Sequence, residues 1–376
     1  MIENVKTELY PELKSPYYIA TLPFTRYSAG VKALHLLCHG LNLRGQRAYL
    51  LPIHPTDRRE RESFCEPSLL TPLLTRQMAK LHAEYGLCPI VIYPEIVVGN
   101  PFNSSCVVRY VLNFPGALGG DKTFNSKELC FGYSKILAAE TTHPENILFI
   151  PASDTRVFYP KEPEKKRTGS CFYASKYKKY FNGQLFEITS NSLEITSGQA
   201  NSQSPEQIAD IFRQSEVFYT YENTALAIEA TLCGCPVVFL PNSYLTSIIA
   251  TEELGRDGFA WGNSVTEIAR AKQSVKRAFD NYKHTINLFY ENLDVFVLKT
   301  QEHAKTKRQS IKNIETLLSH LPKLDDSEWK DENYAPLLKK IPWRAEKIIG
   351  EFLNTLGLEE DGRFLWERSR NRSKKN

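Results

Sequence analysis

The chain has 376 residues, of which 42% are hydrophobic and 11% aromatic, enough for about two globular domains with real cores. Its formal net charge is only +4, and we expect no nucleic-acid partner. No apolar run reaches the ~20 residues that span a bilayer. The first residues lack the basic and then apolar pattern of a secretory signal, so we expect a cytoplasmic protein.

The eight cysteines are scattered in mostly apolar contexts, without a C-x-x-C pair. Cys233 and Cys235 stand too close together for an ordinary zinc site. We therefore expect reduced, mostly buried thiols, as in other cytoplasmic proteins.

The first half alternates predicted strands and helices. Tyr17–Leu22 is a predicted strand, and Val31–Leu43 has apolar residues at helical spacing. Ala48–Pro52 is the next strand. Gly30, at the start of the helix, would let a ligand approach the backbone closely.

Two histidines, His35 and His39, stand four positions apart on that helix. A metal site would need further ligands, and no acidic or thiol partner stands nearby at a convincing spacing. We expect ordinary packing and predict no metal site.

Glu95 follows a predicted buried strand, Pro89–Tyr93. Ligands bind at the carboxyl ends of strands in open α/β sheets, so Glu95 could orient an acceptor hydroxyl or a sugar. A surface salt bridge is the alternative. The other predicted elements of this half are a helix at Thr71–His82, a strand at Cys106–Leu112, and continued alternation over Glu128–Ile136 and Ile147–Ile150.

A charged, proline-bearing stretch divides the chain. We predict an N-terminal domain over 1–160, a linker over 161–169, a second domain over 170–300 and a helical C-terminal extension over 301–376. The second domain opens with a strand, Cys171–Ala174, followed by a lysine-rich segment, Ser175–Lys179. Phe186–Thr189 and Leu193–Ile195 are further predicted strands.

Helical segments are predicted on both sides of the central part of this domain. Ser204 is an N-cap, and Pro205 begins a helix that runs to Arg213. After residue 241, helices are predicted at Ser243–Leu254, at Val265–Leu298 with a break, and at Gln309–Leu318.

The stretch Ser215–Pro241 reads as strand, helix and strand, with the helix over Thr224–Leu232. The helix N-terminus at Asn223 and Thr224 follows a strand, and its unpaired N–H groups and positive dipole end suit a phosphate. Glu229, one to two turns further on, could accept hydrogen bonds from ribose hydroxyls.

The segment Tyr221–Ala230, followed by Cys233–Val238, resembles the donor site of GT-B glycosyltransferases. The resemblance places Glu229 on the glutamate that holds the donor ribose. The family's earlier glutamate falls on Tyr221, with Glu222 one place later, so the pair here is seven apart instead of eight.

Two further segments share the resemblance. The run from 28 to 45 is similar to the first glycine-bearing loop and helix of bacterial glycosyltransferases, and the run from 93 to 116 to a segment of lipopolysaccharide and capsule enzymes. The resemblance implies a donor site whose residues are Gly30, Lys176, Lys178, Tyr221, Asn223, Thr224, Ala225 and Glu229.

The resemblance implies an α/β fold of two Rossmann-like domains facing a cleft, with the acceptor in the first domain and the donor in the second. It also implies a nucleoside-diphosphate-sugar donor, a glycan or lipid-linked acceptor, no cofactor, and a role in bacterial surface polysaccharide synthesis. Retention is favoured, with Glu222 near the sugar; inversion would need Glu95 as base.

Two other functions remain open. A sugar-nucleotide epimerase of the same fold would need acids and bases lining the cleft, and a nucleotide-binding module would lack an acceptor groove. The segment Ile341–Leu356 could pack on the body or contact a membrane surface peripherally, helped by the basic Arg363–Lys375 end.

Overall fold

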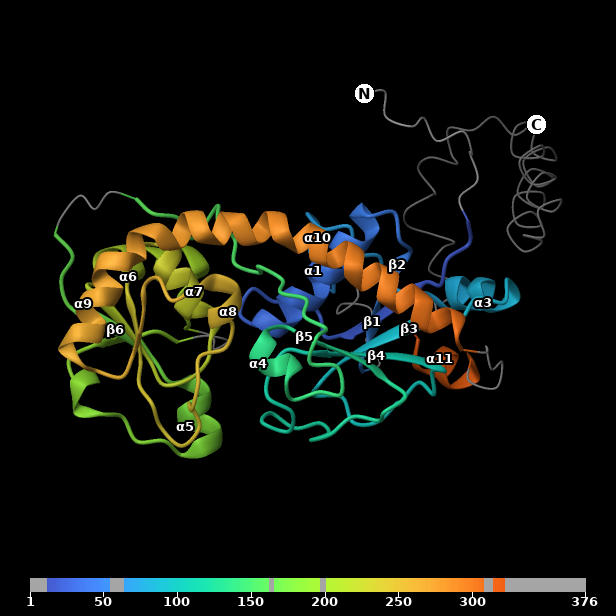
Figure 1. The fold of residues 1–376 in the computed structure, drawn as a ribbon, viewed down its shortest axis with the longest axis horizontal. Helices are drawn as coiled ribbons and strands as arrows, with labels where there is room; N and C mark the ends of the chain where they lie inside the picture. Colours follow the sequence, from blue (N-terminus) through green and yellow to red (C-terminus); the bar gives the residue numbers. More distant parts are fainter. Residues whose placement is uncertain (1–11, 55–63, 162–165, 197–200, 308–313, 322–376) are drawn as a thin grey trace, which may run out of the picture. The chain divides into compact units, whose positions relative to one another are not determined.

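The computed structural model describes residues 12–54, 64–161, 166–196, 201–307 and 314–321. In these segments the chain forms two parallel five-stranded sheets with helices packed around them (Figure 1). The predicted α/β class with two Rossmann-like domains is confirmed. The segment Ile341–Leu356, for which packing on the body and peripheral membrane contact were both open, and the basic end lie outside the described residues.

The first sheet has the strand order β2-β1-β3-β4-β5. Both of its faces are buried, which is why its strands read as apolar runs. In β1, Tyr17 and Ile19 enter one core, and Tyr18 and Ala20 enter the core on the other face. The strands are β1 (Tyr17–Thr21), β2 (Ala48–Pro52), β3 (Ile90–Pro94), β4 (Cys106–Val111) and β5 (Leu129–Gly132).

Side chains determine where the helices of this half begin. Ser28 accepts a hydrogen bond from Val31 N and so caps α1 (Ala29–Leu43). Thr75 caps α3 (Arg76–Glu84) in the same way, so this helix begins five residues after its predicted start at Thr71. The short α4 (Lys135–Ala138) follows β5.

The predicted alternation is wrong at Ile147–Ile150. This segment makes one isolated bridge, between Ile147 and Gly132, and no strand. Its apolar residues reflect burial against the first core.

The second sheet has the order β7-β6-β8-β9-β10. Counted from its own first strand, this is the same order as in the first sheet, with strands 2-1-3-4-5 all parallel. The strands are β6 (Ser170–Tyr173), β7 (Leu193–Glu194), β8 (Val217–Thr220), β9 (Val237–Phe239) and β10 (Phe259–Trp261). The helices are α5 (Ser175–Phe181), α6 (Pro205–Gln214), α7 (Ala225–Leu232), α8 (Thr251–Leu254) and α9 (Val265–Ser274).

Two predictions in this half are wrong because side chains bond the backbone locally. The predicted strand at Phe186–Thr189 is a 3₁₀ turn over Glu187–Thr189, in which the Thr189 hydroxyl donates to Phe186 O. The predicted helix Ser243–Leu254 is reduced to α8. Asn242 Oδ1 accepts from both Tyr244 N and Leu245 N, which holds the chain in a turn instead of a helix.

A long helix, α10 (Ala278–Lys305), connects the two cores (orange in Figure 1). It follows a 3₁₀ turn, Val275–Arg277, which is the break predicted within the helical region. Tyr282 packs in the second core, whereas Phe289, Leu293 and Phe296 pack in the first. After α10, α11 (Ile314–His320) continues the predicted C-terminal extension, and Leu317 and Leu318 pack in the core on the other face of the first sheet.

None of the helices in the described ranges is both long enough and apolar enough to cross a bilayer. All eight cysteines are free thiols, and seven of them are buried.

Candidate active site

A cavity of about 410 Å³ lies where the carboxyl ends of the two sheets meet. Its walls include residues that follow β1, β3 and β4 in the first sheet, and β6 and β8 in the second. In both sheets the strand order reverses between these first and third strands, at β1/β3 and at β6/β8. Ligands of open α/β sheets bind at such switch points, and here two of them face one cavity.

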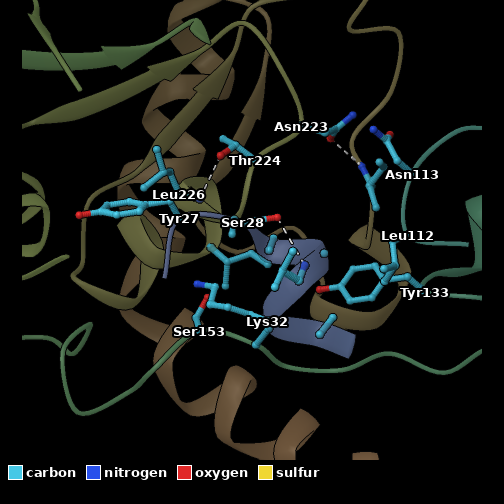
Figure 2. Close-up of a pocket in the computed structure, with 18 of the residues that line it drawn as sticks. Tyr27, Ser28, Lys32, Leu112, Asn113, Tyr133, Ser153, Asn223, Thr224 and Leu226 are labelled. Carbon is cyan, nitrogen blue, oxygen red and sulfur yellow. Dashed lines mark hydrogen bonds between the residues drawn. The ribbon is translucent and has the colours of Figure 1, made fainter. Parts of the chain in front are cut away.

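The N-termini of two helices reach this cavity. The first turns of α1 and α7 line it, and their caps, Ser28 and Thr224, lie on its wall (Figure 2). The N–H groups of a first helical turn have no partner within the helix, and the dipole adds positive potential. The cavity is therefore suited to an anionic group.

An ion pair connects the two halves across the cavity. Lys32 Nζ, on α1, lies 3.1 Å from Glu229 Oε1, on α7, and the two side chains are 13% and 6% exposed. The sequence analysis missed Lys32. Lys32 stands two residues after Gly30, and this is the only nearby sequence feature that points to a site. Its partner, Glu229, stands 197 positions away in the chain.

Six of the eight predicted donor-site residues line the cavity. They are Gly30, Lys176, Asn223, Thr224, Ala225 and Glu229. The Asn223 side chain donates to Ser247 O and accepts from Ile249 N, which ties the loop before α8 to the start of α7. A Cβ on Gly30 would lie 3.6 Å from Leu112 Cδ1, an ordinary contact, so the protein itself does not require glycine there.

Lys178 and Tyr221 do not line the cavity. Lys178 forms an ion pair with Glu194. Tyr221 is fully buried, stacks on Tyr177 and bonds Thr189 Oγ1 through its hydroxyl at 2.7 Å. Both side chains contact other parts of the second half, and their roles in donor binding stay predictions.

Glu222 is also absent from the cavity wall. It is fully buried, and its Oε2 accepts a hydrogen bond from Tyr177 N at 2.9 Å. Burial raises the pKa of this carboxyl, while the Tyr177 N–H opposes the shift. The carboxylate therefore supports the start of α5, and its predicted role near the sugar stays a prediction.

Glu95 lies on the cavity wall, directly after β3, as predicted. It is 4% exposed, and its Oε2 accepts from Leu112 N at 2.9 Å. Burial raises the pKa of Glu95 to about 7, and the N–H of Leu112 and the charge of Lys176 only partly oppose this. A carboxyl with this pKa can accept a proton near neutral pH.

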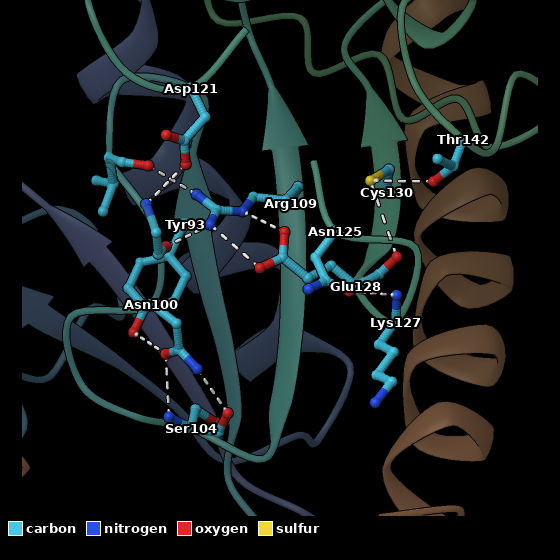
Figure 3. A network of polar contacts seen from close by, with 12 residues as sticks. Tyr93, Asn100, Ser104, Arg109, Asp121, Asn125, Lys127, Glu128, Cys130 and Thr142 are labelled. Carbon is cyan, nitrogen blue, oxygen red and sulfur yellow. Dashed lines mark hydrogen bonds and ion pairs between the residues drawn. The ribbon is translucent and has the colours of Figure 1, made fainter. Parts of the chain in front are cut away.

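A buried network holds the loop that carries Glu95 (Figure 3). Arg109, on β4, donates to Val97 O at 2.7 Å, contacts Gly99 O, and pairs with Glu128 Oε2 at 2.8 Å. The side chain of Asp121 accepts from Gly99 N. These contacts fix the loop backbone within four residues of Glu95.

A glycine is required next to the same loop. Gly120 has φ +79°, and a Cβ there would clash with Glu95 O. The connection between β4 and β5 therefore packs directly against the backbone of Glu95.

The two histidines on α1 are held by backbone groups. His35 Nε2 lies 3.0 Å from Leu22 O, and His39 Nδ1 accepts from Leu70 N at 2.9 Å. Burial lowers the pKa of both rings. Across the described segments, no group of three or more His, Cys, Asp or Glu side chains is arranged to hold a metal ion.

Neither a family model nor a curated protein matches the chain. Among solved structures, it is similar to a glycosyltransferase involved in avilamycin A biosynthesis, with 13% identity over 78% of this chain and 98% of that one, at a TM-score of 0.42. A spinosyn rhamnosyltransferase complexed with thymidine diphosphate has 11% sequence identity over 80% of this chain and 99% of that one, at a TM-score of 0.37. A glycosyltransferase from Rickettsia africae has 10% sequence identity over 82% of this chain and 97% of that one, at a TM-score of 0.38.

Proposed function

We propose that this chain is a glycosyltransferase that moves a sugar from a nucleoside diphosphate to a glycan or lipid-linked acceptor. The observation that carries the proposal is the cavity at both switch points, where two helix N-termini, Lys32, Lys176 and Glu229 come together. We further propose that it works without a metal and in bacterial surface polysaccharide synthesis, as the sequence resemblance implies, and in the cytoplasm, as the pattern of cysteines indicates.

The donor fits the charges of the cavity in one orientation. The diphosphate would lie at the N-terminus of α7, near Lys176, where N–H groups and an ammonium offset its charge. Glu229 would accept hydrogen bonds from the ribose through Oε2, because Lys32 occupies Oε1. Lys32 is then placed to contact both the ribose-binding carboxylate and the phosphates.

The position of the carboxylates supports inversion over the retention that the sequence resemblance favours. Glu95 lies on the wall, and Glu222 does not. In an inverting step the acceptor oxygen attacks the anomeric carbon, the carbon–oxygen bond to the diphosphate breaks, and Glu95 takes the hydroxyl proton. The nucleoside diphosphate leaves with the electron pair, stabilised by the helix dipole and the lysines.

A screen of nucleoside-diphosphate sugars tests the proposal. The chain is expected to release nucleoside diphosphate slowly from one donor without acceptor, and to glycosylate an acceptor when one is supplied. Proton NMR of the product then gives its anomeric configuration. Interconversion of the donor sugar without transfer would show an epimerase, and nucleotide binding without turnover would show a binding module.

We expect Glu229→Ala to weaken nucleotide binding by ~1–3 kcal/mol, because a charged hydrogen bond to the ribose is lost and Lys32 loses its partner. Calorimetric titration with the best nucleoside diphosphate measures this. Glu216→Ala, which breaks the half-exposed ion pair with Lys272 outside the cavity wall, serves as control. Unchanged affinity in a folded Glu229→Ala protein would remove Glu229 from the donor site.

We also expect activity to survive dialysis against EDTA. The diphosphate charge is offset by α7 and the lysines, so no divalent ion is needed. The rate of transfer with and without chelator is the measurement. Full inhibition that magnesium or manganese reverses would contradict this expectation.

A further inference from the structure

Apolar side chains form a row along the wall that the first sheet contributes to the cavity. One follows each of four adjacent strands: Ile53 after β2, Leu22 after β1, Ile96 after β3 and Leu118 after β4. The sheet order β2-β1-β3 makes the first three positions neighbours along one edge, and Leu118, seven residues beyond β4, stands two residues before Gly120, whose backbone packs against Glu95. We call these four residues the apolar row.

Much of this row is accessible to solvent. Leu22, Ile96 and Leu118 are 36%, 40% and 38% exposed. Single exposed leucines are common on protein surfaces and need no explanation. Four apolar side chains that line one cavity are different from single exposed leucines, because grouped exposed apolar side chains mark ligand-binding grooves.

The apolar row lies next to Glu95, the proposed proton acceptor, along the chain. Ile96 follows Glu95 directly in the chain, and Gly120, whose backbone packs against Glu95, lies two residues after Leu118. A molecule whose hydroxyl reaches the Glu95 carboxylate therefore enters the same cavity wall on which the row lies. The groups suited to the diphosphate line the same cavity: the N-terminus of α7, Lys32, and Lys176, whose charge also acts on Glu95.

We propose that the acceptor presents an apolar group beside its reacting hydroxyl and that the apolar row binds this group. The proposal rests on the proposed function and gives the acceptor class. Alkyl, prenyl and aryl glycosides or alcohols share this chemistry. A free oligosaccharide does not fit, because its hydroxyls would lose water against side chains that cannot hydrogen-bond to them.

Binding of a matched pair of probes tests the proposal without a donor. The probes are n-octyl β-glucoside, kept below its micelle concentration, and methyl β-glucoside, which has the same head group. Burial of one methylene favours binding by about fourfold. Because the row can cover only part of the chain, we expect octyl glucoside to bind about tenfold or more tightly, in calorimetric titration of the full-length protein.

Two substitutions on one loop locate the binding. Ile96→Ser is expected to reduce the preference for octyl over methyl glucoside by roughly three- to tenfold. Val98→Ser is the matched control, because Val98 is 67% exposed and does not line the cavity. It should leave the preference unchanged, and both variants should keep the nucleotide affinity and melting temperature of the original chain.

A third probe distinguishes aromatic from aliphatic acceptors. Phenyl β-glucoside binding as tightly as the octyl compound indicates a flat aromatic group, and weaker binding indicates an extended chain; either supports the proposal. Equal binding of methyl and octyl glucosides overturns it, as does a preference that Ile96→Ser leaves intact. Donor hydrolysis is scored separately, so its absence rejects the glycosyltransferase function without affecting the binding result.

Discussion

Glu95→Gln is expected to lower the turnover number of glycosyl transfer by about 10²–10⁴-fold, the usual effect of removing a general base. The glutamine keeps an oxygen that can accept from Leu112 N, so the loop should stay in place. Nucleotide affinity should change much less than turnover, because Glu95 follows β3 of the first sheet, whereas Glu229 and the helix N-terminus proposed to bind the nucleotide belong to α7 of the second half. Steady-state kinetics and calorimetric titration measure the two quantities.

The pH dependence gives a second test of the same residue. Because burial raises the pKa of Glu95 to about 7, the rate of the original enzyme should increase with pH up to about 7 and then level off. The Gln variant should show no such increase. A product with the donor's anomeric configuration, together with a larger loss in Glu222→Gln than in Glu95→Gln, would support retention instead.

The contribution of Glu95 to the stability of the folded chain should fall as pH rises, whereas the rate increases. The folded state holds the Glu95 proton more strongly than the unfolded chain, so the associated stability is present at acidic pH and is lost as pH rises through about 7. Glu95→Gln should therefore gain stability relative to the original chain between pH 5 and pH 8. Urea unfolding at the two pH values measures this.

Arg109→Met is expected to lower the free energy of unfolding by about 3–5 kcal/mol, the range for removing one partner of a buried ion pair. Arg109 is 1% exposed, and its loss leaves the Glu128 carboxylate and the carbonyls of Val97 and Gly99 without their donor. Methionine fills a similar volume, so the effect comes from lost polar contacts. Urea unfolding at pH 7 is the measurement.

Arg44→Met is the matched control. Arg44 pairs with Asp294 and covers the Tyr290 ring, but the ion pair is exposed to solvent, so its loss should cost no more than about 1 kcal/mol. Equal losses in the two variants would show that the network at Arg109 contributes little. Replacing Glu128 by leucine together with Arg109→Met should recover part of the loss, because no buried charge is then left unpaired.

Elements with complete local signals could be predicted from the sequence. Ser204 and Gln207 form the capping box that begins α6, and Gly234, with φ +75°, follows α7 where the sequence predicted its end. The helix predicted at Ser243–Leu254 failed because its conformation depends on side chains that bond the backbone. One of them, Asn223, stands more than twenty positions earlier in the chain.

The candidate site could likewise be predicted only where local sequence signals determine its position. The resemblance placed Glu229 and Asn223 on the cavity wall, because a helix start after a strand has a fixed place in this fold. The direction of the side chains at Tyr221 and Glu222 could not be predicted, since it depends on packing against Tyr177. Lys32 was missed because its partner comes from the other half of the chain.

The path of α10 has a consequence for synthesis on the ribosome. The first sheet is complete at β5, yet one face of its core includes Phe289, Leu293 and Phe296 from α10. At roughly 5–20 residues per second, on the order of ten seconds pass before these residues are made. During this time the face of the first sheet that α10 later covers is exposed. The nascent chain therefore presents an apolar surface to chaperones until α10 has been synthesised.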